Sequence, residues 1–534
     1  MPLIKIDGQE LEVEAGSRLL DVALEAGIEV PHYCYHPALS VVGSCRLCMV
    51  EVEGMPKLQT ACSTPIGEAP PDRKVDGKYD MVVHTDTDKV VAGQKLVLEF
   101  LLLNHPLDCP VCDQAGECGL QDYSFKFGNA HSRFDEDKRV RAAEELGSGV
   151  AINQNRCIMC TRCVRFTQEI TGTNELYVHG RGYDTKIAIF DGLPLDNPLS
   201  GNVADICPVG ALLLKDYMHT TRVWHLSHTE SACVECSSGC SITVDATDNV
   251  VRRIVSRRND QANGHFICDF GRYSFHKYER SEFKEPMRKT PGSGWEMIPW
   301  RQAYQLIADK VAAGGGPGAV KALASPTLPN EPNYILGQFM GRLSDRKNIA
   351  LLPVTQLSDM EFPGGFRISG DKGGNSRGAR DVIPALAASV KALHKTDTGV
   401  IIILDGDGRA EMKGDLTRLM AAAQFSVVVA CMPSEVTQNA DLVLPIAAPY
   451  AREGTFTNDQ GLVQWLQPAL HPPDDVRADW QVVAELGQQL TGEDHLYSYA
   501  GDVTWKITQT TVGYGQITRF RLGKLGQFTA SAAG

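Results

Sequence analysis

The stretch Arg156-Cys-Ile-Met-Cys-Thr-Arg-Cys163 places three cysteines at C-x2-C-x2-C spacing, and a distant fourth, Cys207, is followed directly by Pro208. This pattern is typical of the ligands of a [4Fe–4S] cluster. In the bacterial ferredoxin run, the cysteine before proline closes a second, linked cluster, but no further triplet lies near Cys207. The sequence therefore predicts one [4Fe–4S] site, with the ligands Cys157, Cys160, Cys163 and Cys207.

Three further groups of candidate ligands surround this stretch. The first is Cys34, Cys45, Cys48 and Cys62, the second is His105, Cys109, Cys112 and Cys118, and the fourth is Cys233, Cys236, Cys240 and Cys268. Fifteen of the sixteen cysteines fall into these sets. Only Cys431 is left over, in an apolar run where a small buried hydrophobic side chain is expected.

Two other uses of cysteine compete with iron–sulfur binding. Disulfide frameworks belong mainly to short exported chains, whereas this chain has 534 residues and no export signal in its opening residues. Zinc is the stronger alternative for any single set, because C-x2-C pairs also build structural zinc sites. The presence of four sets in one chain favours iron–sulfur clusters.

The first set lies in a segment that predicts a β-grasp domain. Residues 3–13 alternate around Asp7-Gly8, a hairpin turn signal. Ser17 is expected to cap a helix that runs to about Ala26 and ends at Gly27. The cysteine loop that follows would wrap a [2Fe–2S] cluster, although ten residues separate its first two ligands instead of the plant-type four.

The second set contains a histidine, His105, directly after a helical pattern at about 90–104. In isolation, such a histidine would be structural, but the three cysteines that follow favour ligation. Because imidazole is neutral and thiolate is not, a cluster held by one histidine and three cysteines is one unit less negative than a cluster held by four cysteines. That difference alone favours its reduced state.

Two arginines near the cysteines of the third set, Arg162 and Arg165, allow two interpretations. They either screen the cluster charge or form a solvated basic face.

Around the fourth set, the residues at 223–267 alternate between apolar and polar in short stretches, which predicts a β-rich cap. Beyond residue 273, short apolar runs at 319–324, 348–352, 400–404 and 426–430 alternate with helical patterns, which predicts βαβ units and a parallel sheet.

The net charge, the length of the apolar runs and the absence of nucleotide-binding motifs argue against several classes of function. The formal charge is −13, which does not suggest nucleic-acid binding. No apolar run approaches the roughly 20 residues that span a bilayer. Leu404-Asp-Gly-Asp-Gly408 lacks the full dinucleotide spacing, and no phosphate-binding loop motif occurs, so we expect no NADH or flavin site on this chain.

Taken together, these residues resemble the large iron–sulfur (75 kDa or G-type) subunit of respiratory complex I, NADH:quinone oxidoreductase. The resemblance rests on residues 31–48, 104–121 and 156–166, which look like its three N-terminal signatures. Ala115 stands where the family usually has glycine or serine. Later, residues 440–445, 453–458 and 461–464, with a weaker match at 374–378, look like the molybdopterin oxidoreductase fold.

The resemblance implies an electron-transfer subunit with one [2Fe–2S] and three [4Fe–4S] clusters and no catalytic residue of its own. Its expected partners are the flavin/NADH-binding subunit, a quinone-proximal ferredoxin-like subunit and other peripheral-arm subunits. We expect a peripheral position on the cytoplasmic side of the inner membrane, through the complex alone. In this family the fourth cluster is expected to stabilise rather than to carry electrons.

The short C-terminal section predicts a pterin-free domain, because it has about 260 residues and no cysteine between Cys268 and Cys431. The alternatives are a NAD-linked formate dehydrogenase, which would hold molybdenum or tungsten, a hydrogenase, and a scaffold whose clusters only stabilise it.

The fold class expected is α+β and α/β multidomain. We predict a [2Fe–2S] ferredoxin-like β-grasp domain at 1–85 and a domain with two [4Fe–4S] clusters at 86–222. A [4Fe–4S] cap of molybdopterin oxidoreductase type follows at 223–280, and a shortened molybdopterin oxidoreductase-like α/β domain with a C-terminal tail at 281–534.

Overall fold

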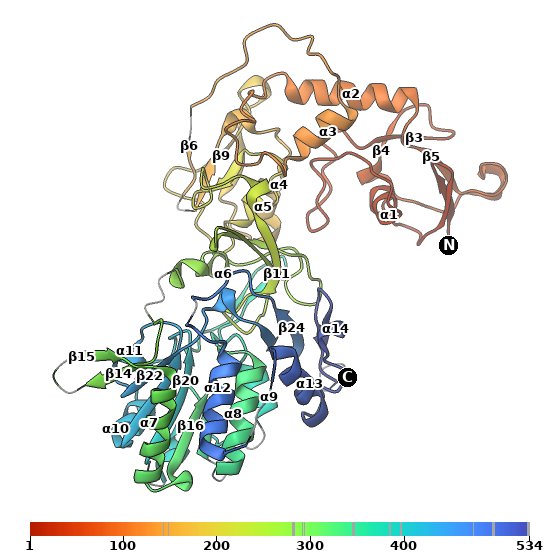
Figure 1. The fold of residues 1–534 in the computed structure, drawn as a ribbon. Coiled ribbons are helices and arrows are strands. Elements are labelled where there is room, and N and C mark those ends of the chain that lie inside the picture. Colours follow the sequence, from red (N-terminus) through yellow and green to blue (C-terminus); the bar gives the residue numbers. More distant parts are fainter. Residues whose placement is uncertain are drawn as a thin grey trace. The chain divides into compact units, whose positions relative to one another are not determined.

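The computed structural model describes residues 1–142, 144–147, 149–279, 283–290, 292, 294–343, 348–383, 386–395, 398–473, 475–493 and 497–530. The chain forms two compact units, Met1–His225 with Phe362–Gly364, and Leu226–Glu361 with Gly365–Gly534 (Figure 1). The domain boundary predicted at residue 280 lies outside the described residues.

The first unit begins with a five-stranded mixed sheet in the order β2-β1-β5-β3-β4. Its strands are β1 (Leu3–Ile6), β2 (Gln9–Glu12), β3 (Met49–Val52), β4 (Gln59–Thr60) and β5 (Met81–His84). The predicted hairpin is present, with Asp7 and Gly8 both at positive φ, as a two-residue turn between twisted strands requires.

One helix boundary was predicted wrongly. Helix α1 is Leu19–Glu25, and its N-cap is Arg18 rather than Ser17, with no side chain bonded to the first turn. The Ser17 carbonyl accepts instead from the amide of Ile66, so this residue belongs to the chain crossing before the helix. The predicted end at Gly27 agrees with its φ of 76°.

The rest of the first unit carries short elements joined by long loops. Its helices are α2 (Asp88–Leu102), α3 (Gly119–Phe127), α4 (Arg162–Arg165) and α5 (Asn202–Asp205), and its strands are β6 (Glu144–Glu145), β7 (Val150–Ile152), β8 (Leu176–His179), β9 (Lys186–Ile189) and β10 (Leu212–Leu214). The side chain of Thr87 caps α2 by accepting from the amide of Val90. The helix ends at Leu102, so His105 comes shortly after it, as predicted.

The second unit opens with the predicted β-rich cap, a sheet of β11 (Ser227–Ala232), β12 (Ser241–Thr247) and β13 (Val250–Ser256). Helix α6 (Asp269–Arg272) follows, and Cys268 is the residue before it. All three strands lie within the stretch 223–267 for which short strands were predicted.

A seven-stranded sheet organises the rest of the second unit, in the order β15-β14-β22-β21-β20-β16-β17. The parallel strands are β16 (Val320–Ala324), β17 (Ile349–Leu351), β20 (Val400–Gly406), β21 (Phe425–Ala430) and β22 (Leu442–Pro445). β14 (Met287–Thr290) and β15 (Gly294–Met297) extend one edge in antiparallel fashion. The βαβ prediction is thus confirmed.

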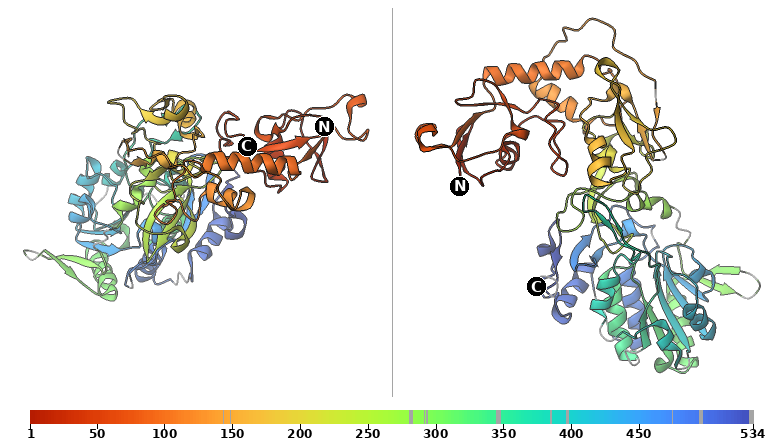
Figure 2. Two further views of the ribbon diagram at one scale, coloured as in Figure 1. Left: turned by 90° about the horizontal axis from the view of Figure 1, so that it is seen from above. Right: turned by 180° about the vertical axis from the view of Figure 1, so that it is seen from behind.

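Helices cover both faces of this sheet (Figure 2). Ile402 and Val427 pack in one core cluster with residues of α7 (Trp300–Ala313), α8 (Asn330–Leu343) and α12 (Asp479–Thr491). Ile401 and Val428 pack in another with residues of α10 (Asp415–Ala422) and α11 (Glu435–Gln438). Burial on both faces explains why these strands read as continuous apolar runs.

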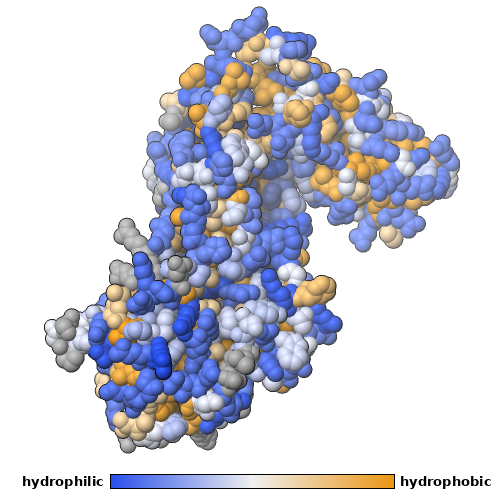
Figure 3. Space-filling model, in the orientation of Figure 1, coloured by the Kyte–Doolittle hydropathy of each residue, from blue (hydrophilic) through white to orange (hydrophobic). Residues whose placement is uncertain are grey.

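The remaining elements of the second unit are helices α9 (Ser376–Val382), α13 (Ala500–Thr510) and α14 (Arg519–Leu522) and strands β18 (Met360–Glu361), β19 (Arg367–Ile368), β23 (Gly454–Thr457), β24 (Leu462–Leu466) and β25 (Gln527–Phe528). Polar residues dominate the visible face of both units, with apolar residues scattered among them (Figure 3). Within the described ranges, no helix is both long and apolar enough to span a bilayer.

Candidate metal centres

The first set comes together in the loops around the N-terminal sheet. The thiol of Cys34 interacts with those of Cys45 and Cys62, and Cys62 also interacts with Cys48. These hydrogen bonds lower the pKa of Cys34 and raise that of Cys62. Cys34, Cys48 and Cys62 are buried, so the loop holds four thiols in a region suited to a cluster shielded from water.

The second set lies after α2. His105, Cys109 and Cys118 line one cavity of about 480 Å³ with apolar Leu102 and Leu120 among its walls. Burial, with smaller contributions from Arg156 and Lys138, lowers the pKa of His105 to about 4. The imidazole is therefore neutral at pH 7, which is the form that ligates a metal.

The fourth member of this set, Cys112, is buried against the backbone of Gly210. A Cβ at position 210 would lie 2.3 Å from the Cys112 Sγ. Gly210 follows Cys207 by three residues, so the absence of a side chain there brings the backbone of the third set close to a candidate ligand of the second.

The third set surrounds a single apolar cavity. All four of its cysteines line one small cavity, with Ile152, Ile187 and Leu212 among the other walls. Burial raises the pKa of Cys157 to about 12 and that of Cys160 to about 11. Four thiols around one apolar cavity match the surroundings that a [4Fe–4S] cluster requires.

The two arginines of the third set are not a solvated basic face. Arg165 is 6% exposed, and it donates to the carbonyls of Ser40 (2.5 Å), Cys34 (2.5 Å) and Cys160 (3.3 Å). Arg162 donates to the carbonyl of Ile206, next to Cys207. These guanidinium groups thus lie beside the candidate ligands and join two sets, which their sequence positions do not reveal.

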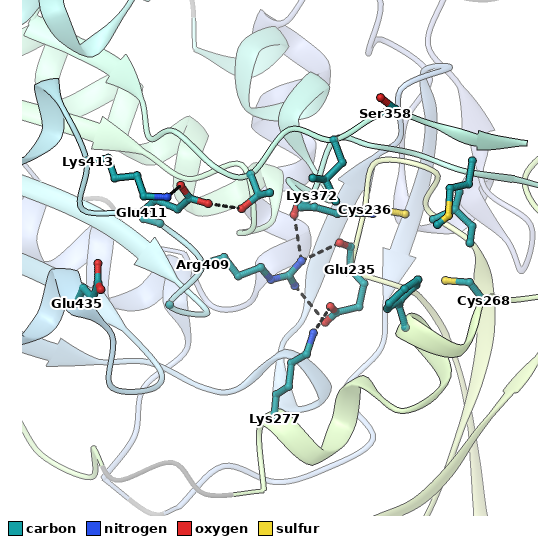
Figure 4. A pocket seen from close by; sticks show the side chains of 17 residues that line it. Glu235, Cys236, Cys268, Lys277, Ser358, Lys372, Arg409, Glu411, Lys413 and Glu435 are labelled. Carbon is teal, nitrogen blue, oxygen red and sulfur yellow. Dashed lines mark hydrogen bonds and ion pairs between the residues drawn. The ribbon is translucent and has the colours of Figure 1, made fainter. Parts of the chain in front are cut away.

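The fourth set lies in the cap of the second unit, and all four cysteines are buried. The Cys233 amide donates to the Cys240 carbonyl at 2.7 Å. A Cβ at Gly271 would lie 2.9 Å from the Cys233 Sγ and 3.8 Å from the Cys268 Sγ, so this glycine leaves room for the sulfurs. Cys236 and Cys268 line a cavity of about 630 Å³ shown in Figure 4.

The leftover cysteine, Cys431, is 1% exposed, as expected of a small buried hydrophobic side chain. Among the residues that the structure describes, no three His, Cys, Asp or Glu side chains converge as ligands of a single metal ion would. In a [4Fe–4S] cluster each ligand binds a different iron, so such ligands lie further apart than those of one zinc ion.

Comparison with known families divides the chain in the same way as the ligand sets. A 2Fe-2S cluster binding domain matches residues 3–69, and the NADH-ubiquinone oxidoreductase-G iron–sulfur binding region matches 94–133. The ferredoxin-like domain of NADH-quinone oxidoreductase subunit 3 matches 147–213. The Fe4S4 domain of molybdopterin oxidoreductases matches 226–278, and a molybdopterin oxidoreductase domain matches 371–489. Each of the first four ranges contains one complete set.

Curated relatives of this chain carry the names of one type of subunit. The G-type subunit of NADH-quinone oxidoreductase from Rickettsia bellii is 37% identical over 340 residues, which cover 64% of this chain and 48% of the relative. The NADH-ubiquinone oxidoreductase 78 kDa subunit of Candida albicans is 28% identical over 93% of this chain and 84% of the relative. The chain is similar to the G-type iron–sulfur subunits of NADH:quinone oxidoreductase. It spans about half the length of the Rickettsia subunits that it matches.

A solved structure of a NAD+-reducing NiFe hydrogenase also aligns with this chain. Its TM-score is 0.36 and its identity 31%, over 42% of this chain and 91% of the hydrogenase chain. The family-model matches to the iron–sulfur domains confirm the predicted kinds of domain, a 2Fe-2S domain followed by 4Fe-4S domains.

Proposed function

We propose that this chain is the electron-transfer subunit of an NADH:quinone oxidoreductase. It would bind one [2Fe–2S] cluster at the first ligand set and one [4Fe–4S] cluster at each of the other three. When bound, such clusters supply one-electron storage, and the protein supplies ligands, burial and hydrogen bonds. The predicted domains at 1–85, 86–222, 223–280 and 281–534 are part of this proposal, as is the absence of a pterin from the last.

The observation that carries the proposal is the direct contact among the three ligand sets of the first unit. The Tyr33 hydroxyl, next to Cys34, donates to the carbonyl of Gly119, next to Cys118, at 3.2 Å, so the first set contacts the second. Arg165 bonds to the backbone of both Cys34 and Cys160, so it joins the first set to the third. The backbone at Gly210 contacts Cys112, and Arg156 pairs with Asp108 at 2.9 Å, so the third set joins the second. A scaffold that used clusters only for stability would not need such links.

This arrangement favours a relay through the three sets of the first unit. Electrons would enter from a flavin subunit that oxidises NADH and leave toward a quinone-proximal ferredoxin-like subunit. The chain would attach to the cytoplasmic side of the inner membrane through partner subunits. The fourth set lies in the second unit, and we infer for it a stabilising role.

Elemental analysis of anaerobically purified protein tests the cofactor content. One [2Fe–2S] and three [4Fe–4S] clusters amount to about 14 iron atoms per chain. Stoichiometric molybdenum or tungsten would instead indicate a formate dehydrogenase, and zinc in place of iron would end the electron-carrier proposal.

The relay itself is tested in the assembled complex. Cys109→Ser should abolish NADH-to-quinone electron transfer while the complex still assembles, because it removes a ligand from one of the three sets of the relay. Cys431→Ser is the matched control, since that cysteine belongs to no ligand set. Full activity in Cys109→Ser would contradict the relay.

A further inference from the structure

The loop between Cys233 and Cys236 contains a buried carboxylate. Glu235 is 7% exposed, although it immediately precedes one candidate ligand and follows another by two residues. A carboxylate beside a cluster adds negative charge and opposes reduction of that cluster. The surroundings of Glu235 therefore bear on both the geometry and the potential of the fourth site.

Arg409 reaches this loop from a distant part of the sequence. It follows strand β20 by three residues, and its side chain is 17% exposed. Its Nη1 donates to the Glu235 carbonyl at 2.9 Å and to the Lys372 carbonyl at 3.0 Å. Its Nη2 donates to Oε1 of Glu235 at 3.2 Å (Figure 4). The same Nη2 also donates to the Val234 carbonyl at 3.2 Å.

These contacts use the shape of the guanidinium as well as its charge. The rigid fork holds two successive carbonyls within the C-x2-C loop and one on a neighbouring segment. A lysine ammonium carries the same charge, but as a single point it cannot reproduce this planar set of bonds. The loop is thus held by a residue outside the cap that contains the four cysteines.

The charges around the loop are balanced by a small network. Glu235 accepts from Lys277 Nζ at 2.6 Å and from the Tyr278 hydroxyl at 3.0 Å, in addition to Arg409. Arg409 also forms an ion pair with the buried Asp407. Without Arg409, Glu235 would retain Lys277, and Asp407 would lose this ion pair, so net negative charge would increase beside Cys233 and Cys236.

We propose that Arg409 is a positioning residue for the cluster at Cys233, Cys236, Cys240 and Cys268. It holds the first two ligands in place through the loop carbonyls, and it offsets the charge of Glu235 so that the cluster is easier to reduce. This inference rests on the proposed function, because it requires that these four cysteines bind a [4Fe–4S] cluster.

The test is a redox titration of the anaerobically purified full chain, monitored by electron paramagnetic resonance. The signal of the fourth cluster is the one that disappears in Cys268→Ala. Arg409→Met should lower its midpoint potential, with at least a tenfold change in the one-electron equilibrium, about 59 mV. Glu235→Gln should shift it in the opposite direction, because it removes a negative charge.

Two further variants separate charge from geometry. Arg409→Lys keeps the charge but loses the fork, so its potential should stay within tenfold of the wild-type equilibrium while a chelator removes iron faster. Lys413→Met is the control, because Lys413 lines the same cavity but its side chain is 78% exposed and pairs with Glu411. It should change neither measurement.

Each outcome decides the proposal. A wild-type potential and wild-type iron release in Arg409→Met would overturn it. Selective loss of the fourth signal in that variant would support the positioning role, and Glu235→Gln would then decide the charge effect. If the wild-type chain shows no signal that depends on Cys268, the cluster assignment itself fails, and this inference fails with it.

Discussion

Gly210 lies where two proposed clusters meet, and we expect Gly210→Ala to remove one of them selectively. The added methyl group would lie 2.3 Å from the Cys112 Sγ, whereas ordinary contact begins at 3.4 Å. The sulfur or the loop must therefore move by about 1.1 Å. That shift is several times the roughly 0.2 Å tolerance of metal–ligand distances, and overpacking of this kind typically costs about 1–3 kcal/mol.

The expected result is loss of the cluster at His105, Cys109, Cys112 and Cys118 while the other three remain. Iron content should fall from about 14 to about 10 atoms per chain. The magnetic resonance signal of this cluster should disappear, and the circular dichroism spectrum should stay close to that of the wild type.

Gly119→Ala is the matched control. Gly119 directly follows Cys118, a candidate ligand of the same cluster, but a Cβ there would find its nearest neighbour, the Pro208 carbonyl oxygen, at 3.6 Å. It should retain all the iron. A Gly210→Ala protein with the full iron content and an unchanged signal would refute the reasoning, because Cys112 would then not need its present position.

Three further changes test other parts of the proposed relay. Arg165→Met leaves three carbonyls without their buried donor. The free energy of unfolding of the first unit, measured by urea titration, should therefore fall by about 3 kcal/mol. An unchanged free energy would contradict the bridging role of Arg165. His105→Cys replaces a neutral ligand with an anionic one, so the midpoint potential of that cluster should fall; a higher potential would argue against ligation by His105. Burial raises the pKa of Cys160 to about 11 and that of Cys157 to about 12, and binding requires the thiolate. The fraction of each thiolate increases about tenfold per pH unit below its pKa, so cluster reconstitution at the third set should accelerate from pH 7 to 9; a rate independent of pH would contradict this account.

The sequence alone predicted the candidate ligand sets and determined most of the elements. Fixed short spacings such as C-x2-C place ligands on one loop, so they can be recognised without a fold. The parallel strands were equally clear, because strands buried on both faces are apolar at every position, as residues 400–404 show. The boundary at Ser17 was wrong because a serine before an apolar run fits both a cap and a chain crossing.

Only the tertiary structure decided how the sets connect and what surrounds them. Arg165 lies 131 residues from Cys34, and Arg409 lies 174 residues from Glu235, yet each pair is hydrogen-bonded. No local pattern encodes such contacts, since they depend on how separate loops pack. The same holds for Gly210, which must lack a side chain because it lies against Cys112, a residue 98 positions earlier in the sequence. Ligand chemistry is therefore local in this protein, whereas the order and the environment of the proposed clusters arise from packing.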